Sequence, residues 1–233
     1  MRSIKIGTCA FAALTILVTG VADADSIPLY STGFSGSGDL LGNGVADANY
    51  RLVVGSGFAP TYVLDDVFPE GGSSPWNDNT DAARWITPSV VLENDDFSEH
   101  APGEYIYRTE FYLDETGFLA RIFASINIEG RWSTDNAGTD IRLNMNSTGN
   151  TSDKYSRWSY FSIDASLADD YGFFKPGWNT LDFVVFNYDD VANPTGLLVE
   201  IADASAVAPV PEPASMALLG IGIVGLVARK RRM

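Results

Sequence analysis

Apolar and polar residues alternate along much of the middle of this chain. From Phe118 to Ile128 every even-numbered position is apolar, and most of the odd-numbered positions between them are polar. A period of two residues indicates a β-strand that buries one face. The same alternation predicts strands at residues 105–113, 141–145 and 197–201, and shorter apolar runs predict others at 50–54, 62–64 and 85–92.

The run at residues 181–186 is more nearly continuous in its apolar character, which predicts a central strand covered on both faces. Clusters of Gly, Ser, Asn, Asp and Pro, such as those at 71–75 and 146–153, separate the predicted strands. No long segment shows the 3.6-residue period of a helix. The pattern therefore predicts an all-β domain, an antiparallel β-sandwich or jelly roll.

Two apolar segments lie at the ends of the chain. Residues 6–18 follow the basic residues Arg2 and Lys5 and precede the small residues Ala22 and Ala24. This order is typical of a secretory signal peptide and predicts cleavage after Ala24. The alternative, an N-terminal membrane helix, is disfavoured because the 13 residues at 6–18 are too few to cross a bilayer.

The second apolar segment, residues 214–228, contains no charge. As a helix it would be about 22 Å long against roughly 30 Å of bilayer hydrocarbon, which is short for a permanent anchor. It lies between the motif Val210, Pro211, Glu212, Pro213 and the basic cluster Arg229, Lys230, Arg231, Arg232. The basic cluster is expected on the cytoplasmic side, so the motif, kept extended by its two prolines, faces outward.

The motif, the apolar segment and the basic end, in this order, resemble the PEP-CTERM sorting tail of bacterial surface and exopolysaccharide-associated proteins. An ordinary tail anchor is the alternative. The resemblance implies export through the secretion translocon, transient retention in the inner membrane, and cutting near the motif by an exosortase-type enzyme. The final location would be the cell surface or extracellular matrix of a Gram-negative-type bacterium.

These features predict four parts of the chain. They are a signal peptide at 1–24, a β-sandwich domain at 25–202, a linker at 203–209 and a sorting tail at 210–233. A signal helix and a short apolar helix would thus flank the β domain.

The segment between the two ends is strongly acidic. It holds nine of the 15 Lys and Arg residues and 28 of the 30 Asp and Glu residues, which gives a formal charge of −19. Such a body repels nucleic acid and anionic membranes. No cofactor is expected except calcium, for which Asp39 with Asp47, or Asn187 with Asp189 and Asp190, offer oxygen ligands.

Two scarce residue types limit catalysis. Cys9 is the only cysteine and lies in the signal peptide, and His100 is the only histidine and is expected in a solvated loop. Adjacent acidic pairs occur at 65–66, 95–96, 114–115, 169–170 and 189–190. Neighbours on a strand point to opposite faces, so these pairs do not suit a glycosidase. A non-catalytic protein is expected; a glycan-processing hydrolase would need carboxylates from different strands, about 5–10 Å apart.

Phrases along the middle segment are similar to a body shared by many PEP-CTERM proteins, a galactose-binding-like jelly roll. They lie at residues 44–50, 85–88, 107–111, 134–144, 177–185 and 193–200. The phrase at 134–144 also resembles non-catalytic sandwich modules attached to glycoside hydrolases, which usually continue with glycine where this chain has Met145. That departure predicts a longer loop at 146–150 in place of a tight turn. Jelly rolls of this kind commonly bind sugars, but many are purely structural.

Tryptophans in predicted loops give the candidate sugar site, because an exposed indole is a flat platform for a sugar ring. The main cluster is Trp132 with Asp135, Asn136, Asp140 and Asn144. The second cluster is Trp76 with the polar residues at 77–79. The alternative is that these tryptophans are core residues and the polar residues cap turns. Carbohydrate binding is thus the leading expectation, and a structural or adhesive matrix role is the close second.

Overall fold

The computed structural model describes residues 24–64, 75–90, 100–113, 126–164, 173–188 and 191–207, all within the compact unit Asp23–Pro209. The strands are β1 (Ala24–Ser26), β2 (Ala46–Val54), β3 (Gly57–Leu64), β4 (Trp85–Thr87), β5 (Gly103–Leu113), β6 (Ile126–Asp135), β7 (Ala137–Leu143), β8 (Asn146–Ser147), β9 (Ser159–Asp164), β10 (Gly177–Asn187) and β11 (Gly196–Val207). In these ranges no helix has the length and hydropathy to cross a membrane. The helices expected near the two termini lie outside them.

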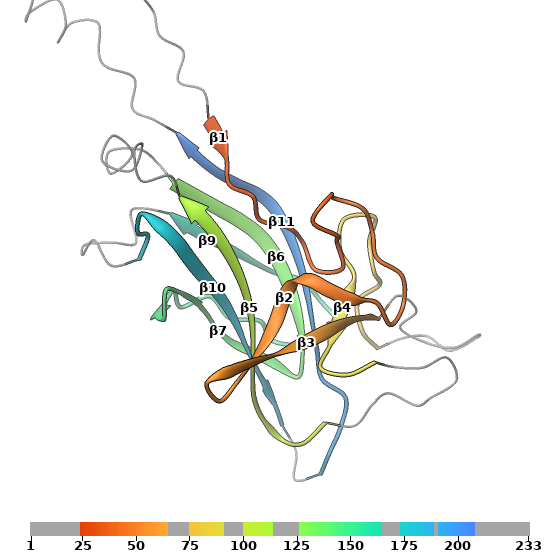
Figure 1. Cartoon of the computed structure of the whole chain (residues 1–233). Helices are drawn as coiled ribbons and strands as arrows, with labels where there is room; N and C mark the ends of the chain where they lie inside the picture. Colours follow the sequence, from red (N-terminus) through yellow and green to blue (C-terminus); the bar gives the residue numbers. More distant parts are fainter. Residues whose placement is uncertain are drawn as a thin grey trace, which may run out of the picture. The chain divides into compact units, whose positions relative to one another are not determined.

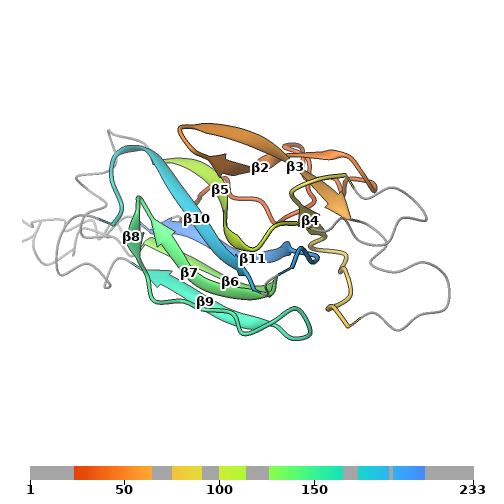
Figure 2. The ribbon, with the colours of Figure 1, turned by 90° about the horizontal axis from the view of Figure 1, so that it is seen from below.

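The strands form one antiparallel sheet that curls on itself (Figure 1). Its order is β8-β7-β10-β5-β2-β3-β4-β11-β6-β9, with β1 paired to β11. Seen from below, β2 and β3 lie on one side and β6, β7 and β9 on the other (Figure 2). The predicted all-β antiparallel class is confirmed. The sheet is continuous, and the jelly-roll topology stays a prediction.

Strand β10 is central, as its apolar run predicts. It pairs with β5 along one edge and β7 along the other. Phe183 on its inner face contacts the rings of Trp132, Phe161 and Tyr50, with centroids 5.6, 5.9 and 6.2 Å away. Because Trp132 lies on β6 and Phe161 on β9, these contacts join the two sides of the curled sheet. The hydrophobic core lies between them.

The last strand is longer than expected. Ala206 pairs with Ile126 of β6, and Val207 pairs with Ala24 of β1. Residues 203–207, for which the sequence predicts a linker, therefore belong to the sheet, and that predicted boundary is wrong. The small alanines that suggest a linker pack in this strand, where Ala206 is fully buried.

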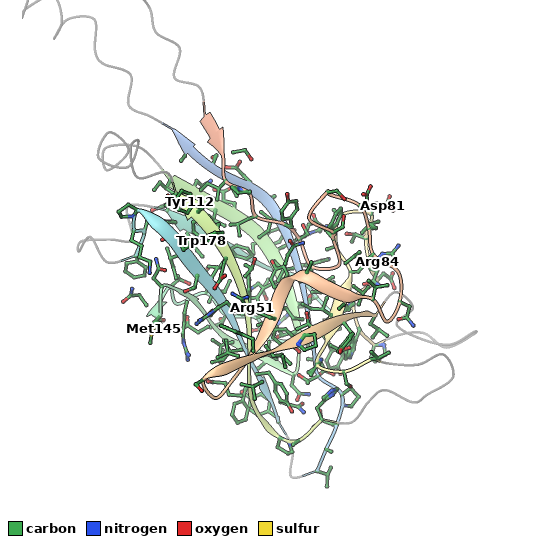
Figure 3. The ribbon with its side chains drawn as sticks, in the orientation of Figure 1. Arg51, Asp81, Arg84, Tyr112, Met145 and Trp178 are labelled. Carbon is green, nitrogen blue, oxygen red and sulfur yellow. The ribbon has the colours of Figure 1, made fainter. Side chains whose placement is uncertain are left out.

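A tight turn joins β7 to β8, contrary to the expected longer loop. Asn144 and Met145 form it, with φ angles of 51° and 71°. The Asn144 side chain donates to the carbonyl of Phe173 and accepts from the amide of Thr180, 3.0 Å away, which holds the turn in place. Met145 is 80% exposed, so the turn tolerates its side chain but gains no packing from it (Figure 3).

The left-handed backbone of Met145 predicts that Met145→Gly stabilises the domain. Glycine adopts this conformation without the steric cost that other residues incur, so the free energy of unfolding should rise by about 0.5–1 kcal/mol. Urea denaturation measures the change. Asn144→Gly is the matched control: it has the same backbone preference but loses the side-chain hydrogen bonds, so it should destabilise. A loss of stability in Met145→Gly would contradict this account of the turn.

Candidate functional site

The tryptophans of both predicted sugar sites are core residues, so these predictions are wrong. Trp132 is completely buried, and Trp76 is 6% exposed and packs on Trp85 with ring centroids 4.4 Å apart. A Cβ on Gly138 would lie 2.4 Å from the Trp132 ring, so that glycine makes room for the indole. Neither ring has a free face for a ligand. The even-numbered apolar positions that begin at Phe118 continue to Trp132, a signal that predicts its burial.

The polar residues around Trp132 are not brought together. Asn136 and Asn144 lie at opposite ends of β7, roughly 25 Å apart at about 3.3 Å per residue. Asn136 donates to Asp135 over 2.9 Å and accepts from the amide of Tyr188 over 2.7 Å, which ties the β6–β7 turn to the end of β10. Asp140 is bonded to the hydroxyl of Ser147 over 3.0 Å. Their roles are to hold turns and strand ends.

The segment after Trp76 is also structural. The indole of Trp85 donates to the carbonyl of Asn77 over 2.8 Å, and its backbone amide donates to the side-chain oxygen of Asn79 over 2.7 Å. Asn79 in turn donates to the carbonyl of Leu64 over 2.8 Å. These bonds fix the segment against β3 and β4.

A different aromatic pair is exposed on the outer face of the sheet. Trp178 of β10 is 63% exposed and Tyr112 of β5 is 44% exposed. The two residues are register partners, and their rings meet edge to face with centroids 5.6 Å apart (Figure 3). Neither Trp178 nor Tyr112 is among the candidate site residues that the sequence predicts. Both belong to the outward set of an alternating strand.

A cleft of about 190 Å³ adjoins Trp178. Its wall includes Tyr30 from the N-terminal segment, Asn49 and Arg51 from β2, and Arg108 and Glu110 from β5. The cleft thus combines two aromatic side chains with amide, guanidinium and carboxylate groups. This is the combination expected of a site for a small polar ligand.

The cleft exists because β2 pairs with β5 over two residues only, Arg51 with Arg108 and Leu52 with Tyr107. In the part of β2 that precedes Arg51, the buried carboxylate of Asp47 accepts hydrogen bonds from the backbone amides of Asn49 and Tyr50, over 2.8 and 3.2 Å. These amides are therefore satisfied without a neighbouring strand. Burial raises the pKa of Asp47, and its hydrogen bonds to backbone amides, including that of Gly33, oppose this shift.

The charges at the cleft are balanced in pairs. Arg108 donates two hydrogen bonds to Asp182, over 2.6 and 2.7 Å, and this bonding raises the pKa of Arg108. Arg51 lies 2.5 Å from Glu110, and its guanidinium lies 4.1 Å from the ring centre of Phe58. The side chains of Arg51 and Glu110 remain 41% and 34% exposed, so their remaining hydrogen-bonding positions can meet a ligand.

The catalytic alternative gains no support at this cleft. Each of its two neighbouring carboxylates is engaged by an arginine, Glu110 by Arg51 and Asp182 by Arg108. A glycosidase needs two carboxyl groups free to transfer a proton or attack the sugar. The five adjacent acidic pairs of the sequence all lie outside the described ranges.

His100 is anchored, not solvated as expected. Its ring Nε2 lies 3.1 Å from the hydroxyl of Ser89, and its backbone pairs with Asn193. The described ranges contain no group of three or more His, Cys, Asp or Glu side chains that suits a metal. Asp39 and Asp47 therefore have no third acidic partner there, while Asp189 and Asp190 lie outside the described residues. A calcium site stays a prediction.

Comparison with known families gives one match. Residues 209–232 match the PEP-CTERM protein-sorting motif. No curated protein and no solved structure matches the chain. The sorting tail predicted from the sequence is thus confirmed, and it lies outside the residues whose structure is described.

Two tryptophan substitutions should separate the core from the candidate site. Trp132→Ala removes a buried ring and should lower the free energy of unfolding by about 3–5 kcal/mol. Trp178→Ala removes an exposed ring and should change it by less than about 0.5–1 kcal/mol. Chemical denaturation of both variants measures the difference. Equal losses of stability would show that the two rings do not differ in burial.

Proposed function

We propose that this chain is a non-catalytic, carbohydrate-binding protein and that the cleft beside Trp178 is its binding site. The sorting motif indicates an exported protein that is sorted to the cell surface and processed by an exosortase-type enzyme. Extracellular polysaccharides are the ligands that we propose for the protein at that location. Passage through the translocon, transient retention in the inner membrane of a Gram-negative-type bacterium, and residence in the exopolysaccharide matrix are parts of the proposal.

The observation that carries this proposal is the exposure of Trp178 beside a polar cleft. Exposed indole rings are costly in water, and the CH groups of a sugar face can cover them. The ring of Tyr112 packs edge to face on that of Trp178, with centroids 5.6 Å apart, and supports it from one side. Arg51 would donate hydrogen bonds to sugar hydroxyl oxygens, Glu110 would accept them from sugar hydroxyls, and Asn49 can do either, which would fix the ligand beside the ring.

The size and charge of the cleft indicate the class of ligand. Its 190 Å³ is below the roughly 300–1,000 Å³ of typical small-molecule pockets, which suits one unit of a longer chain. Both arginines in its wall are paired to a carboxylate, Arg51 to Glu110 and Arg108 to Asp182, so the two pairs carry no net charge. The mature segment carries a formal charge of −19 and repels anionic polymers. A neutral polysaccharide is therefore the proposed ligand.

The proposal predicts that Trp178→Ala weakens binding to neutral polysaccharide about tenfold, a loss of about 1–2 kcal/mol for one stacking ring. Affinity gel electrophoresis of residues 25–209 measures it, with the neutral fraction of the producing bacterium's exopolysaccharide as the ligand. Alginate, an acidic polysaccharide, should not retard the protein.

Met145→Ala is the control variant, because Met145 is also an exposed apolar side chain but is not part of the wall of the cleft. It should bind like the wild type. If Trp178→Ala binds as well as Met145→Ala, the cleft is not the site. If no neutral polysaccharide retards the wild-type protein, carbohydrate binding is wrong and a structural role in the matrix is the better account.

A further inference from the structure

A second, larger groove lies on the outer face of β6, β9 and β11. Its volume is about 580 Å³, and its wall includes Glu129, Arg131, Tyr160, Ser162, Glu200 and Ala202. Tyr160 is 77% exposed, more than Trp178. The two sites share no residue.

The polar side of this groove is an ordered row across the three strands. Tyr160 of β9 pairs in register with Arg131 of β6, which pairs with Glu200 of β11. Arg131 donates to Glu200 over 2.8 Å, and its guanidinium lies 4.3 Å from the ring centre of Trp158. Thr80 donates to the same carboxylate over 3.2 Å. The arrangement repeats the chemistry of the first cleft, with aromatic rings beside a neutralised arginine–carboxylate pair.

The groove is open next to this row because the side chains there are small. Ser162 is two residues beyond Tyr160 on the same face of β9, and Ala202 lies at the irregularity between Ile201 and Asp203 of β11. Neither side chain is large enough to cover the exposed ring of Tyr160. The groove is therefore open along the strands, as a chain-like ligand requires.

Its charge suits the same class of ligand. The Arg131–Glu200 pair has no net charge, and Glu129 and Asp203 are exposed register partners beside it. Carboxylates accept hydrogen bonds from sugar hydroxyls and repel an anionic polymer. A neutral polysaccharide complements this face, whereas an acidic one does not.

The two sites point away from each other. Phe183 of β10 packs against Trp132 of β6 and Phe161 of β9, with centroids 5.6 and 5.9 Å apart. The inner faces of these strands thus meet across the core, so their outer faces, which carry Trp178 and Tyr160, face away from each other. One short oligosaccharide cannot reach both.

We propose that the Tyr160 groove is a second carbohydrate site and that the domain cross-links two polysaccharide chains. The inference rests on the proposed function and adds a bridging activity to it. The two sites lie on one sheet and face away from each other. When both are occupied, the domain therefore joins two separate polysaccharide chains and does not raise the affinity for a single chain.

A bridging assay tests this inference. Beads carry the neutral fraction of the producing bacterium's exopolysaccharide, and a fluorescent preparation of the same polysaccharide is added with residues 25–209. The wild-type protein should bind the beads and capture the fluorescent chains. Trp178→Ala and Tyr160→Ala should each still bind the beads but capture at least tenfold less. The double variant should bind neither, and Met145→Ala should behave like the wild type.

Three outcomes overturn the inference in distinguishable ways. If Tyr160→Ala captures fluorescent chains as well as the wild type, the groove is not a site, and the bridging arises from a dimer of single-site copies. If Trp178→Ala alone removes all bead binding, there is one site only. If the wild type does not bind the beads, the proposed function itself fails. Ser162→Arg, which fills the groove and leaves Tyr160 in place, should match Tyr160→Ala and guards against a folding defect.

Discussion

The packing of aromatic rings around Phe183 is the interaction on which the rest of the structure depends. The only cysteine is in the predicted signal peptide, so no disulfide can hold the domain together. Rings from β2, β6 and β9 meet Phe183 of β10 and join the two sides of a single curled sheet. Each such ring buries on the order of 150–250 Å². Because the inner faces of β10 and β6 meet in this core, their outer faces are turned away from each other.

The core also decides which aromatic residues remain for function. The rings of Trp76, Trp85 and Trp132 are buried in the core, whereas those of Trp178 and Tyr160 are exposed on outer faces of the sheet. Each of these exposed rings lies near an arginine paired to a carboxylate, Arg51 with Glu110 and Arg131 with Glu200. Such pairs present hydrogen-bonding groups without net charge. In an acidic protein sorted to the cell surface, this favours neutral polysaccharides.

The sequence predicts the strands better than it predicts the site. A period of two residues identifies a strand, and the continuous run at 181–186 identifies its central member, because burial imposes both patterns. The sorting tail can be recognised from the sequence alone because its three parts, the motif, the apolar segment and the basic cluster, are contiguous. The prediction that Trp132 is an exposed sugar platform is wrong. The Asp and Asn residues after it indicate a turn, but the alternation of apolar residues predicts that its ring points into the core. The pairing of Trp178 with Tyr112 depends on the register between β10 and β5, and the cleft depends on where the pairing of β2 with β5 ends. Both are contacts between segments that are far apart in the sequence, so no local pattern predicts them.

The central claim is that a neutral sugar covers the exposed indole of Trp178 and leaves the core unchanged. Nuclear magnetic resonance tests it directly, because each of the five tryptophans gives one indole N–H signal. The signal of Trp178, assigned with Trp178→Phe, should shift when a short neutral oligosaccharide fraction is titrated into the protein. The signals of the buried Trp76, Trp85 and Trp132 should stay in place. A titration in which the Trp178 signal does not move, while the polysaccharide still binds, would contradict the account.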